Sequence, residues 1–331
     1  MRQKGAAERT TLQDARPLPD PKPVTLDYRH ADKAHHLVRS LSGVSFDGVC
    51  LWTVSDEGRT LERLAADEQG FVFERQFVLD TLFPDLPSDK EADLEGLDAE
   101  DGRVWLCGSH ARTRAKLAPD GRPSPDIRRR PSRHLLGSVV ATEAADPAAY
   151  ALPFTDAGSL RSRLRDDPLL ADFANLPSKE NGLDIEGLAV LGSRLLLGLR
   201  GPVVAGLAVA VELRLRSDGR IANTAPIRHL LNLGGLGIRD LTRFGEDVLV
   251  LAGPVTGADG PFRIYTWRPV RTKAPQEPKP TWAWLSAEEH PEGFCWLERG
   301  DRFGLLVVYD SPDERRIEGH RYTADWFDLT P

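Results

Sequence analysis

Acidic side chains recur beside glycine at several points of the sequence, in a pattern suited to cation binding. The segment DLEG at 93–96 recurs as DIEG at 184–187, and RD at 239–240 and PEG at 291–293 are shorter relatives. Carboxylates that converge from separate segments repel one another, and a bound cation relieves that repulsion. Calcium takes roughly six to eight oxygen ligands of this kind. The pattern predicts a site for calcium or another divalent cation, with these ligands: Glu95, Glu186, Asp240 and Glu292.

Basic and amide side chains near the same segments could hold an anionic group of a substrate. The residues expected to bind substrate are Lys179, Asn181, Arg200 and Arg239. An arginine fork suits phosphate or carboxylate oxygens. A metal-polarised water beside His110 would make hydrolysis feasible. We therefore expect His110 and Asp240 to be the catalytic residues of a metal-dependent hydrolase that acts on a phosphate ester or a lactone.

The elements that must position these residues form a repeat. If positions 43, 96, 187, 240 and 293 are equivalent, their separations are 53, 91, 53 and 53 residues. Each copy is followed by a turn and a short apolar run, such as LWTV at 51–54 and VWLC at 104–107. Four short strands in about 40 to 55 residues have the dimensions of a propeller blade. The sequence predicts an all-β fold, a β-propeller with five readable blades.

The 91-residue interval leaves room for a sixth blade or an insertion. Within it, residues 156–175 are expected to be helical, with Asp156 as N-cap, and could restrict access to the site. The last copy lacks an outer strand, and residues 24–28 could supply it and so hide the open edge. We expect residues 1–22 to be a flexible segment and residues 23–331 to form a single propeller domain.

In a propeller the first strand of each blade lines the central channel, and the second runs antiparallel to it. The start of the first strand and the end of the second therefore meet at one face, so the acidic and basic residues should converge at one mouth of the channel.

Composition excludes several classes of partner. The formal net charge is −7, which gives no general attraction to nucleic acid or anionic membranes. The longest apolar run, at 203–211, is too short to span a bilayer. Three widely spaced cysteines indicate reduced thiols, so we expect a cytoplasmic protein. We also expect it to be a monomer. The basic run at 128–130 is interpreted as a solvated loop.

An ordered set of motifs resembles a known bacterial family, the domain of unknown function 3616. The motifs are GSH at 108–110, PSKENGLDIEGLA at 177–189, GLRGP at 198–202, LGGLGIRD at 233–240, AGP at 252–254 and PEG at 291–293. The resemblance covers nearly the whole chain from about residue 40 and implies a β-propeller. Some relatives are similar to esterase-like phytases, which would imply a calcium-dependent phosphoesterase. The repeated Glu-Gly is distantly similar to the metal-binding Glu of gluconolactonase-type propellers, but the Asn ligands of those enzymes have no counterpart here.

Two other interpretations remain open beside the hydrolase. The chain could be a non-catalytic binding module whose basic residues hold an anionic small molecule or a partner peptide. Alternatively, the acidic and basic residues could form ion pairs that only hold the blades in register. That structural hypothesis predicts pairing such as Arg239 with Glu186, and no free carboxylate oxygens.

Overall fold

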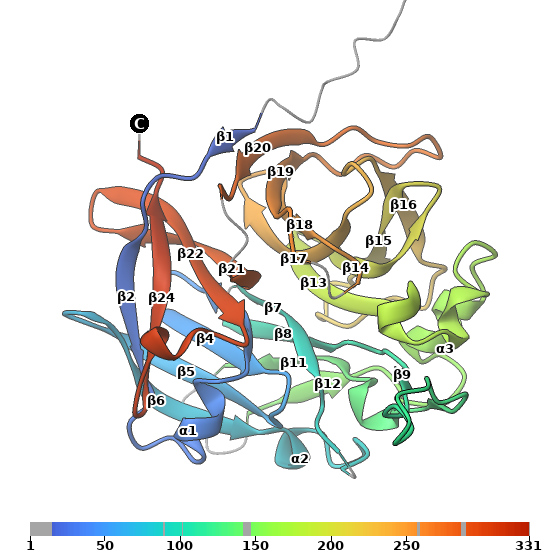
Figure 1. Cartoon of the computed structure of the whole chain (residues 1–331), viewed down its shortest axis with the longest axis horizontal. Coiled ribbons are helices and arrows are strands. Elements are labelled where there is room, and N and C mark those ends of the chain that lie inside the picture. The colour runs from blue at the N-terminus through green and yellow to red at the C-terminus, as the bar shows by residue number, and fades with distance from the viewer. Residues whose placement is uncertain are drawn as a thin grey trace, which may run out of the picture.

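The protein is a β-propeller, with antiparallel sheets arranged around a central axis (Figure 1). The computed structural model describes residues 15–88, 90–100, 102–141, 147–256, 259–285 and 289–330. Within these residues the strands follow one another from the axis outward in each repeat, as the sequence predicts for propeller blades.

Each blade is described from its innermost strand outward. The first contains β3 (Leu41–Phe46), β4 (Cys50–Ser55), β5 (Thr60–Asp67) and β6 (Gly70–Val78). The next contains β7 (Leu94–Glu100), β8 (Arg103–Gly108), β11 (Leu136–Val140) and β12 (Ala149–Ala151). Then come β13 (Asp184–Leu191), β14 (Arg194–Val204), β15 (Leu207–Arg214) and β16 (Ile227–Leu231). They are followed by β17 (Gly237–Phe244), β18 (Asp247–Gly253), β19 (Arg263–Trp267) and β20 (Lys279–Ala283). The last contains β21 (His290–Arg299), β22 (Arg302–Asp310), β24 (Arg321–Asp328) and β2 (Lys22–Asp27), with β23 (Ile317–Glu318) beside β24.

The repeated glycines allow neighbouring inner strands to approach closely. A Cβ atom on Gly96 of β7 would lie 2.7 Å from the Cβ of Leu188 in β13. A Cβ on Gly293 of β21 would lie 2.8 Å from the carbonyl oxygen of Ser42 in β3. Real Cβ atoms do not approach other atoms this closely, so these positions need glycine for packing. Inner strands β3, β7, β13, β17 and β21 contact one another in sequence, and β21 returns to β3.

The extra residues of the long interval lie on the periphery. β7 contacts β13 directly, so within the described residues no further inner strand stands between them. The interval instead contains a small hairpin of β9 (Thr113–Arg114) and β10 (Ile127–Arg128), and helix α3 (Leu160–Arg165). The helical prediction for 156–175 is borne out in part. The N-cap is Ser159 and not Asp156, because the Ser159 side chain accepts a hydrogen bond from the Ser162 amide.

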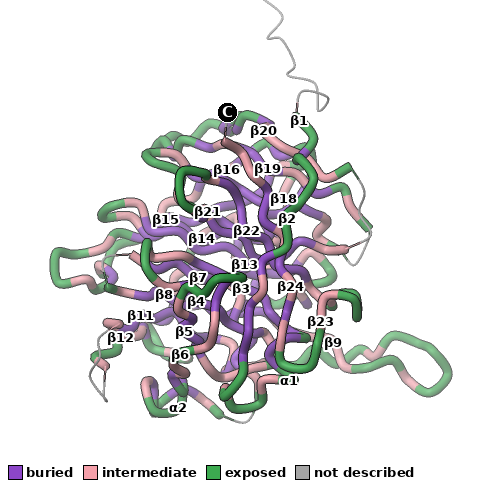
Figure 2. Tube along the Cα trace, turned by 90° about the vertical axis from the view of Figure 1, so that its left-hand side faces the viewer, coloured by how far each residue is buried: buried purple, intermediate pink, exposed green. Residues whose placement is uncertain are grey.

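The N-terminal strand β2 closes the ring, as predicted. It pairs antiparallel with β24 and parallel with β6, which joins the last blade to the first in one continuous sheet. β1 (Arg16–Pro17) pairs with β20, so this part of the predicted flexible segment is a strand, and residues 1–14 lie outside the described part. Figure 2 shows the inner strands buried and the connecting loops exposed. The helices are short, namely α1 (Ala34–Leu37), α2 (Leu79–Leu82) and α3.

Apolar clusters fill the spaces between adjacent blades. One of them packs Leu183, Ile185 and Leu188 of the β13 segment against Trp105 and Cys107 of β8. Burial of this kind is the main contribution to propeller stability. No helix in the described part of the chain is long and apolar enough to cross a membrane.

The junction between β2 and β6 predicts a specific weak point. Gly70 of β6 faces Thr25 of β2, and a Cβ on Gly70 would lie 2.2 Å from the Thr25 carbonyl oxygen. We expect Gly70→Ala to lower the free energy of unfolding by about 2 kcal/mol or more, because the clash is with backbone and forces the closing strand away. Denaturant unfolding measures this change. Val49→Ala, at a side chain 74% exposed, is the control and should have little effect. Equal effects of the two substitutions would contradict the role of β2 in closing the ring.

Candidate functional site

A β-bulge in every inner strand turns one side chain toward the axis. The regular pairing is interrupted between residues 41 and 43, 94 and 96, 185 and 187, 238 and 240, and 291 and 293. A bulge leaves one residue outside the normal alternation and redirects its side chain. We call these five bulged residues the mouth ring: Ser42, Glu95, Glu186, Arg239 and Glu292. The equivalent positions singled out from the repeat are therefore brought together by backbone geometry.

Arg239 lies between two glutamates of the mouth ring and pairs with both. Its Nη2 is 2.6 Å from Oε1 of Glu292, and its Nε is 3.1 Å from Oε2 of Glu186. All three side chains are almost completely buried. The pairing of Arg239 with Glu186, which the structural hypothesis predicts, is confirmed.

Two further arginines, one in a second strand and one in a 3-10 turn, pair with carboxylates in or beside the ring. Arg200, in the second strand of its blade, lies 2.6 Å from Oδ2 of Asp184 and 2.9 Å from Oε1 of Glu186. Arg133 lies 2.6 Å from Oδ2 of Asp93 and 2.7 Å from Oε1 of Glu91. The sequence predicts that Arg200 and Arg239 hold an anionic substrate, but their guanidinium groups are occupied by the protein's own carboxylates.

Glu95 is the member of the ring whose carboxyl group has no partner among the described residues. Its carboxyl group makes no hydrogen bond or ion pair with any described residue, although its neighbours in the ring are engaged. Burial and the charges of Glu292, Asp93 and Glu186 raise its pKa well above the usual value. The structural hypothesis predicts no free carboxylate oxygens, and Glu95 departs from it.

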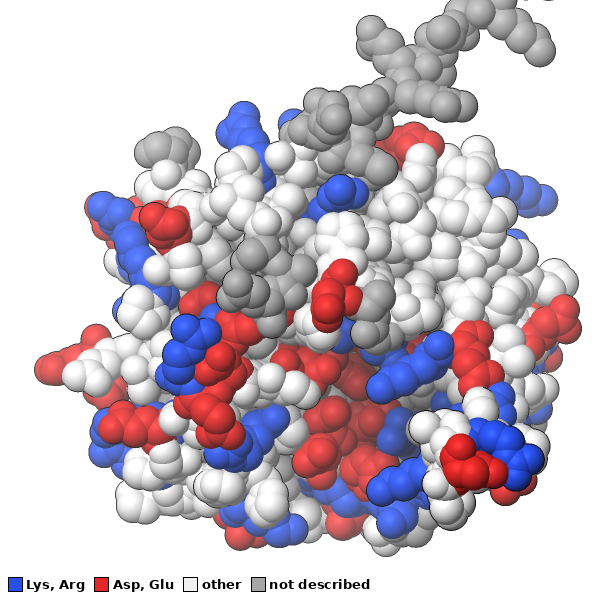
Figure 3. Space-filling view, viewed as in Figure 1, with Lys and Arg blue, Asp and Glu red and all other residues white. Residues whose placement is uncertain are grey.

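Negative charge is in excess around the ring. The carboxyl groups that influence one another here are those of Asp56, Asp93, Glu95, Asp184, Glu186, Glu292 and Asp310. The cations that act on them, among the described residues, are Arg133, Arg200 and Arg239. Burial and like charges raise the pKa of Asp56 to about 7. Figure 3 shows acidic side chains gathered in the hollow at the centre of this face, with basic side chains on its right-hand border and others to its left.

Asp240 occupies the position that is glycine in the other inner strands, and its carboxylate accepts hydrogen bonds from two backbone amides. Its Oδ2 accepts a hydrogen bond of 2.9 Å from the Phe294 amide in β21, and its Oδ1 accepts one of 2.7 Å from the Leu241 amide. Burial raises its pKa well above the usual value. Oδ2 thus holds β17 against β21 and Oδ1 bonds within β17, so backbone amides engage both oxygens.

His110 is buried away from the ring. It is 1% exposed, its Nε2 donates to the Leu135 carbonyl at 3.1 Å, and its ring stacks on His134 at 5.5 Å between centroids. Burial, followed by the positive surroundings of His134 and Arg161, lowers its pKa well below the usual value. Because it contacts no member of the mouth ring through its side chain, the structure does not bring His110 together with the predicted metal ligands.

The two remaining predicted substrate contacts lie in the turn before β13. Asn181 has a left-handed backbone (φ 62°), and its side chain donates to the Val203 carbonyl at 3.1 Å and accepts from the Val203 amide at 2.8 Å. It therefore fastens this turn to the end of β14. Lys179 is exposed, and its ammonium group makes no hydrogen bond or ion pair with a described residue.

The predicted calcium ligands do not fit a calcium site as they are arranged. Glu186 and Glu292 face Arg239, and Asp240 accepts from backbone amides, so Glu95 is the one of these four described residues with neither carboxylate oxygen engaged. Across the described part of the chain, no three His, Cys, Asp or Glu side chains form a metal-binding group. A calcium ion needs several converging oxygens at once, which this arrangement does not supply.

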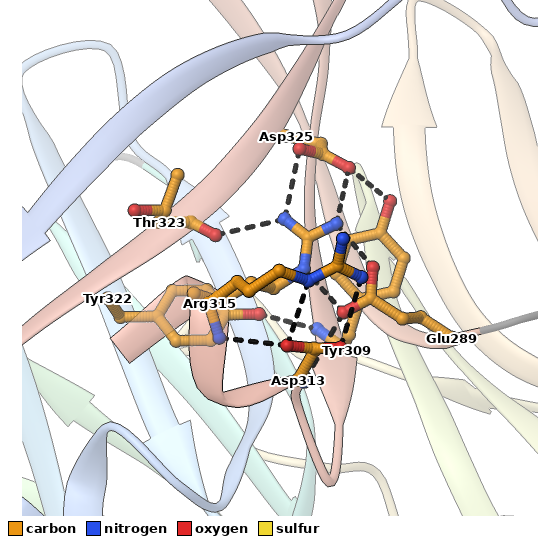
Figure 4. A network of polar contacts seen from close by, with 8 residues as sticks. Glu289, Tyr309, Asp313, Arg315, Tyr322, Thr323 and Asp325 are labelled. Carbon is orange, nitrogen blue, oxygen red and sulfur yellow. Dashed lines mark hydrogen bonds and ion pairs between the residues drawn. The ribbon is translucent and has the colours of Figure 1, made fainter. Parts of the chain in front are cut away.

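In a second polar network, in the last blade, the charged side chains are paired with one another (Figure 4). Arg316 lies 2.6 Å from Oε2 of Glu289 and 2.8 Å from Oδ2 of Asp325, and its guanidinium covers the Tyr309 ring at 4.2 Å. The Tyr309 hydroxyl donates to Asp325 at 2.7 Å. Arg316 is balanced by carboxylates on both sides, which is typical of a structural fastening and not of a second site.

Asp56 and Arg133 also lie at the mouth, but they are not among the catalytic, substrate-binding or metal residues that the sequence predicts. Asp56 follows the second strand of the first blade, and the repeat predicts that the ends of these second strands meet at the mouth. Arg133 comes from a 3-10 turn at 131–133 inside the irregular interval, where no repeat pattern indicates its position.

A model of one protein family matches residues 40–325, and its description reads "Protein of unknown function (DUF3616)". No curated protein sequence matches the chain.

Three solved structures that the chain resembles are distant from it in sequence. A glutaminyl cyclase from Myxococcus xanthus is 10% identical with a TM-score of 0.46, over 95% of this chain and 97% of that one. A GH43_1 enzyme from Xanthomonas citri is 10% identical with a TM-score of 0.48, over 88% of each chain. The β-propeller domain of Swd1 from Myceliophteria thermophila is 12% identical with a TM-score of 0.35, over 87% of this chain and 96% of that domain.

The position of Arg239 predicts a pH-dependent loss of stability when it is removed. Arg239→Met leaves the buried carboxylate of Glu292 without its partner, and such a loss costs about 3 to 5 kcal/mol. Burial already raises the pKa of Glu292, so this carboxyl group can avoid the cost by taking up a proton as the pH falls. We expect the substitution to destabilise the protein strongly at about pH 8 and less at about pH 5, as measured by denaturant unfolding.

The matched control is Arg268→Met, which breaks an exposed ion pair of 2.6 Å with Asp247. Such pairs contribute about 0 to 1 kcal/mol, so this variant should change little at either pH. A loss for Arg239→Met that is the same at both pH values would contradict the role assigned to the carboxylates.

Proposed function

The chain belongs to the DUF3616 family, whose model spans most of it, and from this premise we propose that the protein is a hydrolase with its active site at the mouth ring. In this proposal the protein's own carboxyl groups supply the general acid and the general base. The observation that carries the proposal is the state of Glu95, a carboxyl group with a raised pKa and no partner among the described residues.

Glu95 suits the role of general acid. A carboxyl group that stays protonated near neutral pH can donate its proton to a leaving oxygen, and desolvation with neighbouring negative charge is how proteins reach that state. The bulge fixes its direction, because Glu95 stands outside the regular pairing of β7 and β8. Strongly perturbed carboxyl groups in a hollow are typical of functional sites.

Asp56 suits the role of general base. Its pKa is raised to about 7, so a large fraction is ionised at neutral pH and can accept a proton. In the proposed step, water attacks the carbonyl carbon of a lactone or ester while Asp56 takes a proton from the water. The bond from that carbon to the leaving oxygen breaks as Glu95 gives its proton to the oxygen. Exchange with solvent then returns both carboxyl groups to their starting states.

The charge of the mouth favours an uncharged substrate. Arg200 and Arg239, the cations that could hold a phosphate group there, are already neutralised by Asp184, Glu186 and Glu292. An anionic phosphate ester would meet the excess of carboxylates, and each close pair of like charges costs about 1 kcal/mol or more. Of the two substrate classes expected from the sequence, the lactone, or more generally an uncharged ester, therefore fits better.

A second function rests on the same excess of charge. A non-catalytic module could use the mouth ring to bind an organic cation, whose positive charge would replace the protons on the carboxyl groups. The sequence favours an anionic ligand for a binding module at this site, and the occupied arginines argue against that version.

The hydrolase proposal predicts a defined result for Glu95→Gln. The amide cannot donate a proton as an acid does, so we expect kcat on the best substrate of a lactone and ester panel to fall by about 100-fold or more. Activity of the unaltered protein should rise through about pH 7 as Asp56 ionises, and fall again at higher pH as Glu95 loses its proton. Initial rates across a pH series test both limbs.

The control is Glu246→Gln, at an exposed glutamate of the opposite end of β17 and β18, which should keep full activity. Hydrolysis that survives in Glu95→Gln would reject the acid assignment. If no lactone or ester is hydrolysed while an organic amine raises the melting temperature, the binding function is the correct one.

A further inference from the structure

Four arginine side chains lie together beside the acidic mouth without carboxylate partners in the described part of the chain. They come from the long interval between β8 and β13, and we call them the arginine cluster: Arg112, Arg129, Arg161 and Arg165. Figure 3 shows basic side chains bordering the acidic hollow on the side where Figure 1 labels β9 and α3.

The β9–β10 hairpin brings two of these side chains together. Thr113 pairs with Arg128, and Arg114 pairs with Ile127. Continued by one residue, this antiparallel register sets Arg112 opposite Arg129, at a spacing where cross-strand side chains interact. The Ser178 amide donates to the Arg112 carbonyl at 3.0 Å, which fixes Arg112 against the turn before β13.

Helix α3 supplies the other two. Arg161 and Arg165 are four residues apart, so they project from the same face of the helix. Arg161 is 7% exposed, and its guanidinium donates to the backbone carbonyls of His110 and Ala174. These bonds hold α3 over the end of β8, close enough that Arg112, Arg129 and Arg165 each lower the pKa of Arg161, which burial and these charges bring to about 10.

None of the four guanidinium groups is neutralised by a described residue. Arg112, Arg129 and Arg165 make no side-chain hydrogen bond or ion pair within the described ranges, and Arg161 bonds only to carbonyl oxygens there. Nearby Arg133 differs, because it pairs with Glu91 and Asp93 at 2.7 and 2.6 Å. Adjacent positive charges without a counter-ion disfavour the folded state, since like charges repel.

Buried polar atoms around the cluster also lack partners among the described residues. They include Nε of Arg112, Nε of Arg130 and Oγ of Ser132, all of which can donate a hydrogen bond. Ser132 is 0% exposed. Buried polar groups in proteins are nearly always hydrogen-bonded, so a group of unpaired ones beside unpaired cations indicates a missing acceptor.

We propose that the arginine cluster is a binding site for the phosphate group of a small molecule. A phosphate dianion offers several acceptor oxygens and neutralises two positive charges, and arginine forks match its geometry. The site does not depend on the proposed hydrolysis, because none of its residues belongs to the mouth ring. An extended polyanion such as nucleic acid is disfavoured, since the cluster borders the carboxylate excess of the mouth.

Binding is tested by calorimetric titration of the full chain at constant ionic strength, with inorganic phosphate and phenyl phosphate as probes and chloride as the reference anion. We expect saturable binding of phosphate and none of chloride. The double variant Arg112→Gln, Arg165→Gln should weaken phosphate binding by about 10-fold or more, since it removes two charge-assisted contacts to the anion. Tighter binding of phenyl phosphate would identify an organic phosphate as the ligand, and tighter binding of inorganic phosphate would identify the free ion.

The control variant is Arg268→Gln, at an exposed arginine that pairs with Asp247 in another blade, and it should bind phosphate as the unaltered chain does. Without phosphate, the double variant should melt at an equal or higher temperature, because it removes mutual repulsion. That result separates loss of a ligand site from loss of folding. Absence of saturable binding in the unaltered chain, or unchanged affinity in a folded double variant, would overturn the proposal.

Discussion

The close approach of neighbouring inner strands is the constraint on which the rest of the structure depends. Glycine at the repeated position removes the side chain that would otherwise separate the strands, and the residue before it is left in a bulge. The same local geometry therefore packs the centre and turns Glu95, Glu186 and Glu292 toward the axis. Asp240 is the exception among the repeated positions. Its carboxylate accepts a hydrogen bond from the next inner strand, where glycine in the other repeats allows direct contact between strands. The packing of the inner strands and the arrangement of the site both follow from the β-bulge and the glycine after it.

The two ends of the inner strands differ in how their buried carboxylates are neutralised. At the mouth, Arg239 serves two glutamates and Glu95 has no partner among the described residues, so protons must balance part of the charge. Toward the other end, Asp98 accepts from the Val190 amide at 2.6 Å and lies 3.1 Å from Nε of Arg243, which also pairs with Glu100. Carboxylates at both ends are buried, yet those at the mouth exceed the arginines that face them. Burial alone does not explain the excess, because the fold neutralises buried carboxylates where it has no other use for them.

The sequence was sufficient for the propeller, for closure by the N-terminal strand and for the convergence of the acidic positions, because all three depend on a repeat whose spacing is visible. It also predicted the pairing of Arg239 with Glu186. The structural roles of Asp240 and His110 could not be predicted from the repeat. Asp240 has the chemistry of a ligand, and only the register shows both oxygens bonded to backbone amides. His110 follows a strand that leads to the mouth, but its left-handed backbone (φ 55°) belongs to a turn in which its ring lies under α3, stacked on His134.

The arginine cluster was hidden for a related reason, since its members are distant in sequence and come together only through the hairpin and α3. Its position beside the mouth is informative about how the face is used. Unpaired carboxylates and unpaired guanidinium groups on one face would stabilise the fold if they were paired with each other. Arg133 shows that such pairing is sterically available, because it comes from the same interval and reaches Asp93. Keeping the remaining charges apart costs stability, and departures of this kind from the best local arrangement are typical of functional sites. The face as a whole is therefore suited to a ligand that is uncharged or cationic at the mouth and anionic where it meets α3.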